Sequence, residues 1–84
     1  MKTFIYTLSE KSHDKSANPN QTISLYLVED NEPRLLRNIG IRYESPRSAI
    51  LNSLLDNGDI PTAGMVTVGW TELASGKIAR LIEL

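Results

Sequence analysis

The segment Ser45–Asp59, SPRSAILNSLLDNGD, decides the fold class because it carries the start and stop signals of one helix. Ser45 is a typical N-cap residue, and Pro46 suits the first helical position. The pair Asn57-Gly58 is a typical helix stop. The apolar side of the segment consists of Ala49, Ile50, Leu51, Leu54 and Leu55. We therefore expect a single helix of about three turns, packed through this side on the rest of the chain.

The remainder of the chain alternates apolar and polar residues, which is the pattern of half-buried strands. This alternation predicts strands at residues 3–8, 22–29, 34–43, 65–73 and 77–84. The short connection DNEP predicts that the second and third strands form an antiparallel hairpin. The expected fold is α+β, in the order β-β-β-α-β-β. Its sheet is expected to be mostly antiparallel and five-stranded, with the helix packed on one face.

The alternation in the third strand predicts which face of the sheet is the core face. Its odd-numbered side is the expected core side and consists of Leu35, Arg37, Ile39, Ile41 and Tyr43. The opposite face of the sheet is half polar and is expected to face solvent or a partner. Its predicted members are Ser24, Tyr26, Asn38, Arg42 and Thr67.

Length and composition predict one small soluble domain covering residues 1–84, with a mobile polar loop at residues 9–21. The chain is 40% hydrophobic and has a net charge of −1, so no overall field attracts nucleic acid or an anionic membrane. It contains no cysteine, which excludes disulfides and thiolate metal sites. No signal peptide and no membrane span are predicted, and we expect a cytoplasmic protein.

Catalytic chemistry has little support in the sequence. Ser12-His13-Asp14 unites three triad residue types, but neighbouring residues on one loop do not converge on a catalytic geometry, so a solvated loop is favoured. Glu29, Asp30 and Glu32 cluster at the hairpin turn. A solvated turn is favoured there over one end of a hydrolytic pair or a weak calcium site. We predict no enzyme activity, no cofactor and no metal.

Arginine is concentrated in one part of the chain, with four of the five arginines between residues 34 and 47. Arginine suits bidentate and stacked contacts at interfaces. The alternative is that these arginines pair across the sheet with Glu29, Glu44 and Glu72. Trp70 is expected in the core, whereas an exposed Trp70 would mark a binding hot spot. The predicted partner-binding residues are Arg34, Arg42, Arg47, Tyr26 and Asn38.

As an architecture, the whole chain resembles the small phage anti-CRISPR proteins. The resemblance rests on the opening strand MKTFIYTLS, the polar loop, the mid-chain helix SPRSAILNSLL and the closing strand RLIEL. It implies a phage or mobile-element inhibitor that binds and blocks a CRISPR–Cas effector complex in the host cytoplasm. No functional residue is carried over from the group.

The functional prediction is therefore a small non-enzymatic interaction protein with a protein partner, a Cas effector subunit being one candidate. The alternative is a sheet-platform module that binds nucleic acid. The expected state is a monomer or a homodimer, because an exposed edge strand permits pairing with a second copy without requiring it.

Overall fold

The structure, a computed structural model, describes residues 3–60, 67–72 and 78–83, with side chains described for residues 3–60. Its elements are β1 (Thr3–Leu8), β2 (Gln21–Glu29), β3 (Glu32–Ile41), α1 (Pro46–Asp56), β4 (Thr67–Glu72) and β5 (Ile78–Glu83). Backbone pairing places the strands in the order β3-β2-β1-β5-β4, and each neighbouring pair is antiparallel. The fold class is α+β.

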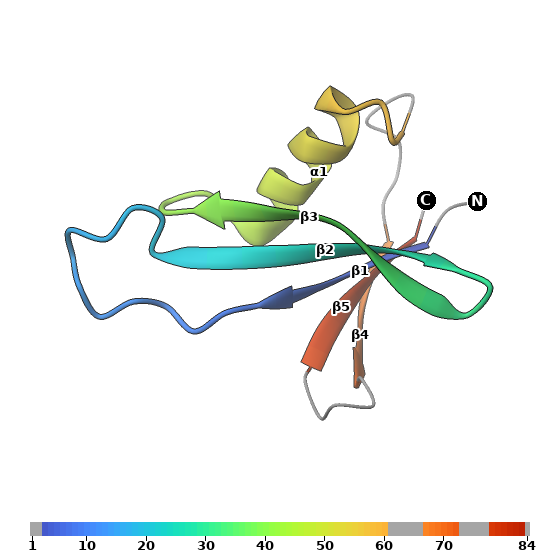
Figure 1. Ribbon diagram of the computed structural model, residues 1–84, viewed down its shortest axis with the longest axis horizontal. Coiled ribbons are helices and arrows are strands. Elements are labelled where there is room, and N and C mark those ends of the chain that lie inside the picture. The colour runs from blue at the N-terminus through green and yellow to red at the C-terminus, as the bar shows by residue number, and fades with distance from the viewer. Residues whose placement is uncertain (1–2, 61–66, 73–77, 84) are drawn as a thin grey trace.

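The predicted relation between helix and sheet needs correction. The helix is not packed over a five-stranded sheet; it follows three strands and packs on the three-stranded antiparallel sheet β3-β2-β1. In Figure 1, β4 and β5 extend from β1 in another direction, away from α1. A helix is about 10 Å wide and strands lie about 4.8 Å apart, so one helix shields two or three strands of a twisted sheet.

The described core lies between this three-stranded sheet and α1. Both faces of the contact are aliphatic or aromatic, and no polar side chain among residues 3–60 is fully buried. Ile60, just beyond the helix, closes the core at one end. The buried cluster consists of Phe4, Tyr6, Ile23, Leu25, Ile41, Ile50, Leu54 and Ile60.

The helix begins as the sequence predicts. The Ser45 hydroxyl accepts a hydrogen bond from the backbone N–H of Ser48 at 3.2 Å, which satisfies one donor of the first turn. Pro46 occupies the start of the helix, where its missing N–H costs nothing. The N-terminal boundary is confirmed.

The helix also ends as predicted, through a Schellman arrangement of hydrogen bonds. Gly58 has a φ of 72°, and its N–H donates to the carbonyl of Leu55 at 3.1 Å. The N–H of Asp59 donates to the carbonyl of Leu54 at 2.8 Å. These are the two bonds that close a helix at a left-handed residue, and glycine adopts that conformation without steric cost. The turn aims Asp59 back toward the sheet.

The hairpin between β2 and β3 is tighter than the predicted DNEP connection. Its turn consists of Asp30 and Asn31 alone, both with positive φ (51° and 63°), as a type I′ turn requires. Glu29 pairs with Glu32, so β3 begins two residues earlier than expected. Pro33 is tolerated because β3 lies at the edge of the sheet.

A bulge in β3 overturns part of the predicted core face. Arg37 pairs with Leu25 but Leu35 pairs with Tyr26, which leaves Leu36 as an extra residue and reverses the alternation. Leu36 packs against the core, whereas Leu35 is 51% exposed. The prediction was wrong for Leu35. It was also wrong for Tyr43, which lies beyond the end of the strand and is exposed.

Two further predictions concern side chains near the end of the chain and a membrane span. The expectations for the side chains of Trp70, Thr67 and Glu72 fall outside the residues whose side chains are described. Among the described residues, no helix is long and apolar enough to cross a membrane.

Candidate functional site

The loop between β1 and β2 is an extension of the hairpin that those strands form. Beyond the strands, the N–H of Ser9 donates to the carbonyl of Thr22 at 2.9 Å, and that of Ser12 to the carbonyl of Asn20 at 2.8 Å. Asn20 in turn donates to the carbonyl of Ile41 at the end of β3, at 3.2 Å. Figure 1 shows the resulting arm, which projects past the ends of β2 and β3.

The tip of this arm is shaped by Asp14. Its carboxylate accepts hydrogen bonds from the hydroxyl of Ser16 at 2.7 Å and from the N–H of Ser16 at 2.9 Å. These bonds, the hydroxyl first, hold the pKa of Asp14 below its ordinary value. A catalytic triad would require this carboxylate to orient His13. The described contacts of Asp14 form a turn, as expected for a solvated loop.

Arg42 joins the arm to the end of β3. Its Nη2 donates to the carbonyl of Lys15 at 3.0 Å, across 27 residues of chain. Pro19 packs directly on Gly40, where an added Cβ would lie 2.7 Å from the Pro19 Cγ, so only glycine fits this approach. We call residues 12–17, Arg42 and Tyr43 together the loop–junction surface.

Tyr43 is the most exposed large hydrophobic residue of this part of the chain, with 86% of its surface accessible. The guanidinium carbon of Arg42 lies 5.2 Å from the centre of its ring, within the range of a cation–π contact. Glu44 fixes the turn beneath them, because its Oε2 accepts the N–H groups of Arg42 (2.9 Å) and Tyr43 (3.1 Å). The aromatic ring is thus presented to solvent on an ordered backbone.

The turn under Tyr43 should respond to acid in a defined way. Hydrogen bonds from backbone N–H groups, that of Arg42 first, hold the pKa of Glu44 below its ordinary 4.5. A carboxyl whose folded pKa is lowered stabilises the turn above its unfolded pKa, and this contribution is lost as pH falls through the lowered value. We expect the amide NMR signals of Arg42 and Tyr43 to titrate together with a midpoint below 4.5. Glu44→Gln should abolish this titration, and a midpoint at or above 4.5 would contradict the assignment.

The structure does not bring the five predicted partner-binding residues together. Arg42 belongs to the loop–junction surface, and Arg47 lies in the first turn of α1, close to it in the chain. Arg34 lies at the opposite end of the sheet and pairs with Glu29 at 2.8 Å, as the cross-sheet alternative expected. Tyr26 and Asn38 lie on the sheet face opposite the core.

That opposite face is organised in rows across three strands. One row is Thr7, Ser24 and Asn38, in which the Ser24 hydroxyl donates to Oδ1 of Asn38 at 3.0 Å. The next row contains Ile5, Tyr26 and Leu35. The register thus separates a polar row from an apolar one.

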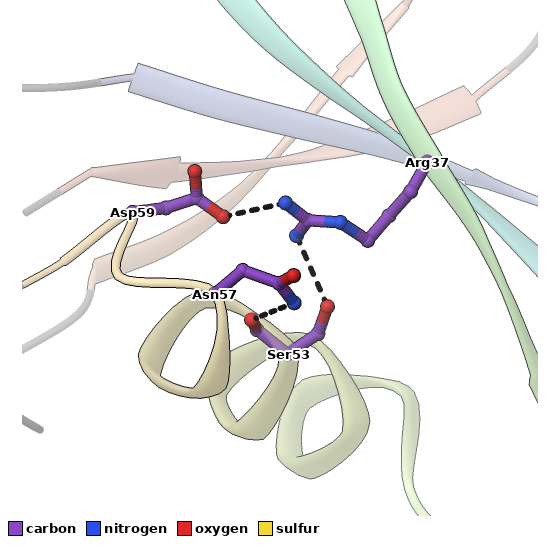
Figure 2. Close-up of polar contacts among 4 residues, drawn as sticks. All are labelled: Arg37, Ser53, Asn57 and Asp59. Atoms are coloured by element: carbon purple, nitrogen blue, oxygen red, sulfur yellow. Dashed lines mark hydrogen bonds and ion pairs between the residues drawn. The ribbon is translucent and has the colours of Figure 1, made fainter.

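Arg37, the fourth arginine of the cluster, holds the helix to the sheet (Figure 2). Its Nη2 lies 2.7 Å from Oδ2 of Asp59, and its Nη1 donates to the Ser53 hydroxyl at 3.1 Å. The two charged side chains are only 26% and 23% exposed. In the same close-up, Asn57 donates from Nδ2 to the carbonyl of Ser53 at 2.8 Å. This cluster positions the end of α1 over β3.

Sequence reasoning missed two features of the site. The exposure of Tyr43 was hidden by the assumption that β3 continues to residue 43, although the helix N-cap at Ser45 leaves little room for a strand there. The role of Lys15 depends on its backbone carbonyl, which no side-chain pattern reveals. Among residues 3–60, whose side chains are described, no group of three potential metal ligands gathers, and the acids of the β2–β3 turn form no such group.

Comparison of the chain with protein-family models, curated proteins and solved structures finds no match in any of the three. These comparisons therefore assign no family to the chain.

Proposed function

We propose that this chain is a small non-enzymatic interaction protein that binds a protein partner through the loop–junction surface. The observation that carries the proposal is the exposed Tyr43 ring beside the Arg42 guanidinium, on a turn held by Glu44. Tyrosine and arginine supply much of the binding energy at protein interfaces. A turn whose backbone is already held by hydrogen bonds loses less conformational entropy when it binds.

The charges of this surface favour a protein over nucleic acid. Lys15 and Arg42 are accompanied by Asp14 in the surface and by Glu44 beside it, so both signs of charge are present, and the whole chain has a net charge of −1. Binding to a phosphate backbone depends chiefly on an excess of cations. A partner surface with mixed charges matches this arrangement better.

The specific form of the proposal is a phage or mobile-element inhibitor, such as an anti-CRISPR protein that blocks a CRISPR–Cas effector complex. Its support is the overall resemblance in size and element order, together with a surface suited to protein binding. Many inhibitors of this group block an effector complex by binding it, which requires neither a cofactor nor a catalytic site.

The test is binding to a panel of purified CRISPR–Cas effector complexes, measured by co-elution and by inhibition of target DNA cleavage. We expect at least one complex to be bound and inhibited, and Tyr43→Ala or Arg42→Ala to weaken binding by about 10-fold or more. Arg34→Ala removes an exposed arginine at the opposite end of the sheet and serves as the matched control. It should leave binding unchanged.

Three results would contradict the proposal in different ways. Failure to bind any effector would reject the inhibitor form. Equal effects of Arg34→Ala and Arg42→Ala would reject the loop–junction surface. A gel shift with DNA or RNA at low salt that is lost steeply as salt increases would favour the nucleic-acid alternative.

A further inference from the structure

The sheet face opposite the core carries no charged side chain along β1, β2 and β3. This is unusual in a chain in which 23% of the residues are charged. Depletion of charge around an aromatic residue is typical of the centre of a protein interface. The strand register places on this face Thr3, Ile5, Thr7, Thr22, Ser24, Tyr26, Val28, Pro33, Leu35, Asn38 and Gly40.

Exposure on this face increases from β1 toward the β3 edge. In the apolar row, Ile5 is buried, Tyr26 is half-buried and Leu35 is 51% exposed. The bulge at Leu36 turns Leu35 to this side, where a regular strand would have placed it in the core. Bulges commonly re-aim a side chain in this way. The apolar surface therefore lies beside the edge of the sheet.

The two ends of this face carry opposite net charges. At the hairpin end, residues 29–34 contain three acids and one arginine. At the other end, residues 9–20 and 42–47 contain four lysines and arginines and three acids. The arm and the end of β3 are held together by the bond from Arg42 to Lys15, so these two segments share one end of the sheet.

We propose that this face binds a second copy of the same chain, face to face, in a two-fold symmetric dimer. An uncharged surface meets its own copy without like-charge contacts, and a two-fold interface requires such self-complementarity. When the two-fold axis lies in the plane of the interface and is perpendicular to the strands, the strands of the two copies run in opposite directions. The acidic hairpin end of one copy then lies over the basic end of the other. The centre of this interface is the sheet face, whereas its basic end includes the segments that form the loop–junction surface.

The test is the concentration dependence of the molar mass of the full chain, measured by analytical ultracentrifugation. We expect the mass to increase from 9.4 kDa toward twice that value, with a dissociation constant on the order of 1–100 µM. Leu35→Lys should weaken association by more than about 10-fold. Leu8→Lys is the matched control, since Leu8 is also an exposed leucine but shares the core side of the sheet, and it should dimerise as the unsubstituted chain does.

Concentration-dependent amide shifts provide a second measurement that does not depend on any variant. They should occur at Tyr26, Leu35 and Asn38 and be small along α1. A molar mass of 9.4 kDa at every concentration would overturn the dimer and leave the face to another partner. Undiminished association of a folded Leu35→Lys variant, or an equal loss in Leu8→Lys, would overturn this interface.

Discussion

Replacing Arg37 by alanine is expected to lower the free energy of unfolding by about 2 kcal/mol. Arg37 spans from β3 to the end of α1, with its ion pair to Asp59 and its hydrogen bond to Ser53 both partly shielded from water. Such a pair is stronger than an exposed one, and its loss leaves the carboxylate of Asp59 without this partner in a half-buried place. Denaturant titration followed by circular dichroism measures the effect.

Arg34→Ala is the matched control for this prediction. Arg34 lies on the same strand and also pairs with a carboxylate at 2.8 Å, but its side chain and that of Glu29 are 62% and 57% exposed. An exposed pair contributes little, so the free energy of unfolding should change by less than about 0.5 kcal/mol. Equal losses in the two variants would show that Arg37 does not anchor the helix.

Replacing Leu36 by alanine is expected to cost about 2 kcal/mol, whereas Leu35→Ala should change the free energy of unfolding by less than about 0.5 kcal/mol. The two residues are neighbours of identical type, and only the bulge decides which one packs against the core. In a strand without the bulge, Leu35 would pack against the core, and Leu35→Ala would then cost more stability than Leu36→Ala. The pair therefore tests the backbone geometry of β3 directly.

The stability of Leu36→Ala and Leu35→Ala should be measured under conditions in which the chain does not dimerise. Leu35 lies in the proposed dimer interface, and dimerisation would add to the apparent stability of the folded state. Unfolding followed by tryptophan fluorescence at sub-micromolar concentration avoids this contribution. A larger loss in Leu35→Ala than in Leu36→Ala under these conditions would contradict the bulge.

Local signals in the sequence predicted the helix and the hairpin well. Ser45 and Asn57-Gly58 act through hydrogen bonds to backbone groups a few residues away, so their effect does not depend on the rest of the fold. The type I′ turn at Asp30-Asn31 is likewise a local preference, although the hydrophobic pattern alone placed the start of β3 two residues too late.

The candidate site was much harder to predict than the fold. The concentration of arginine near Arg42 indicated the right region, but the other predicted residues lie at the hairpin end or on the opposite sheet face. Arg37 and Arg42 are of the same residue type and five positions apart. One holds the helix and the other borders an exposed tyrosine, because their surroundings come from distant segments.

By itself, the sequence determined the α+β class, the limits of α1 and the pairing of β2 with β3, since capping, turn preference and alternation act between residues close in the chain. Only the tertiary structure decided that α1 covers three strands, that Leu36 rather than Leu35 packs against the core, and that Tyr43 remains in solvent. These outcomes depend on which side chains fill the space between helix and sheet. One added residue in a strand moves the residues beyond it to the opposite face of the sheet.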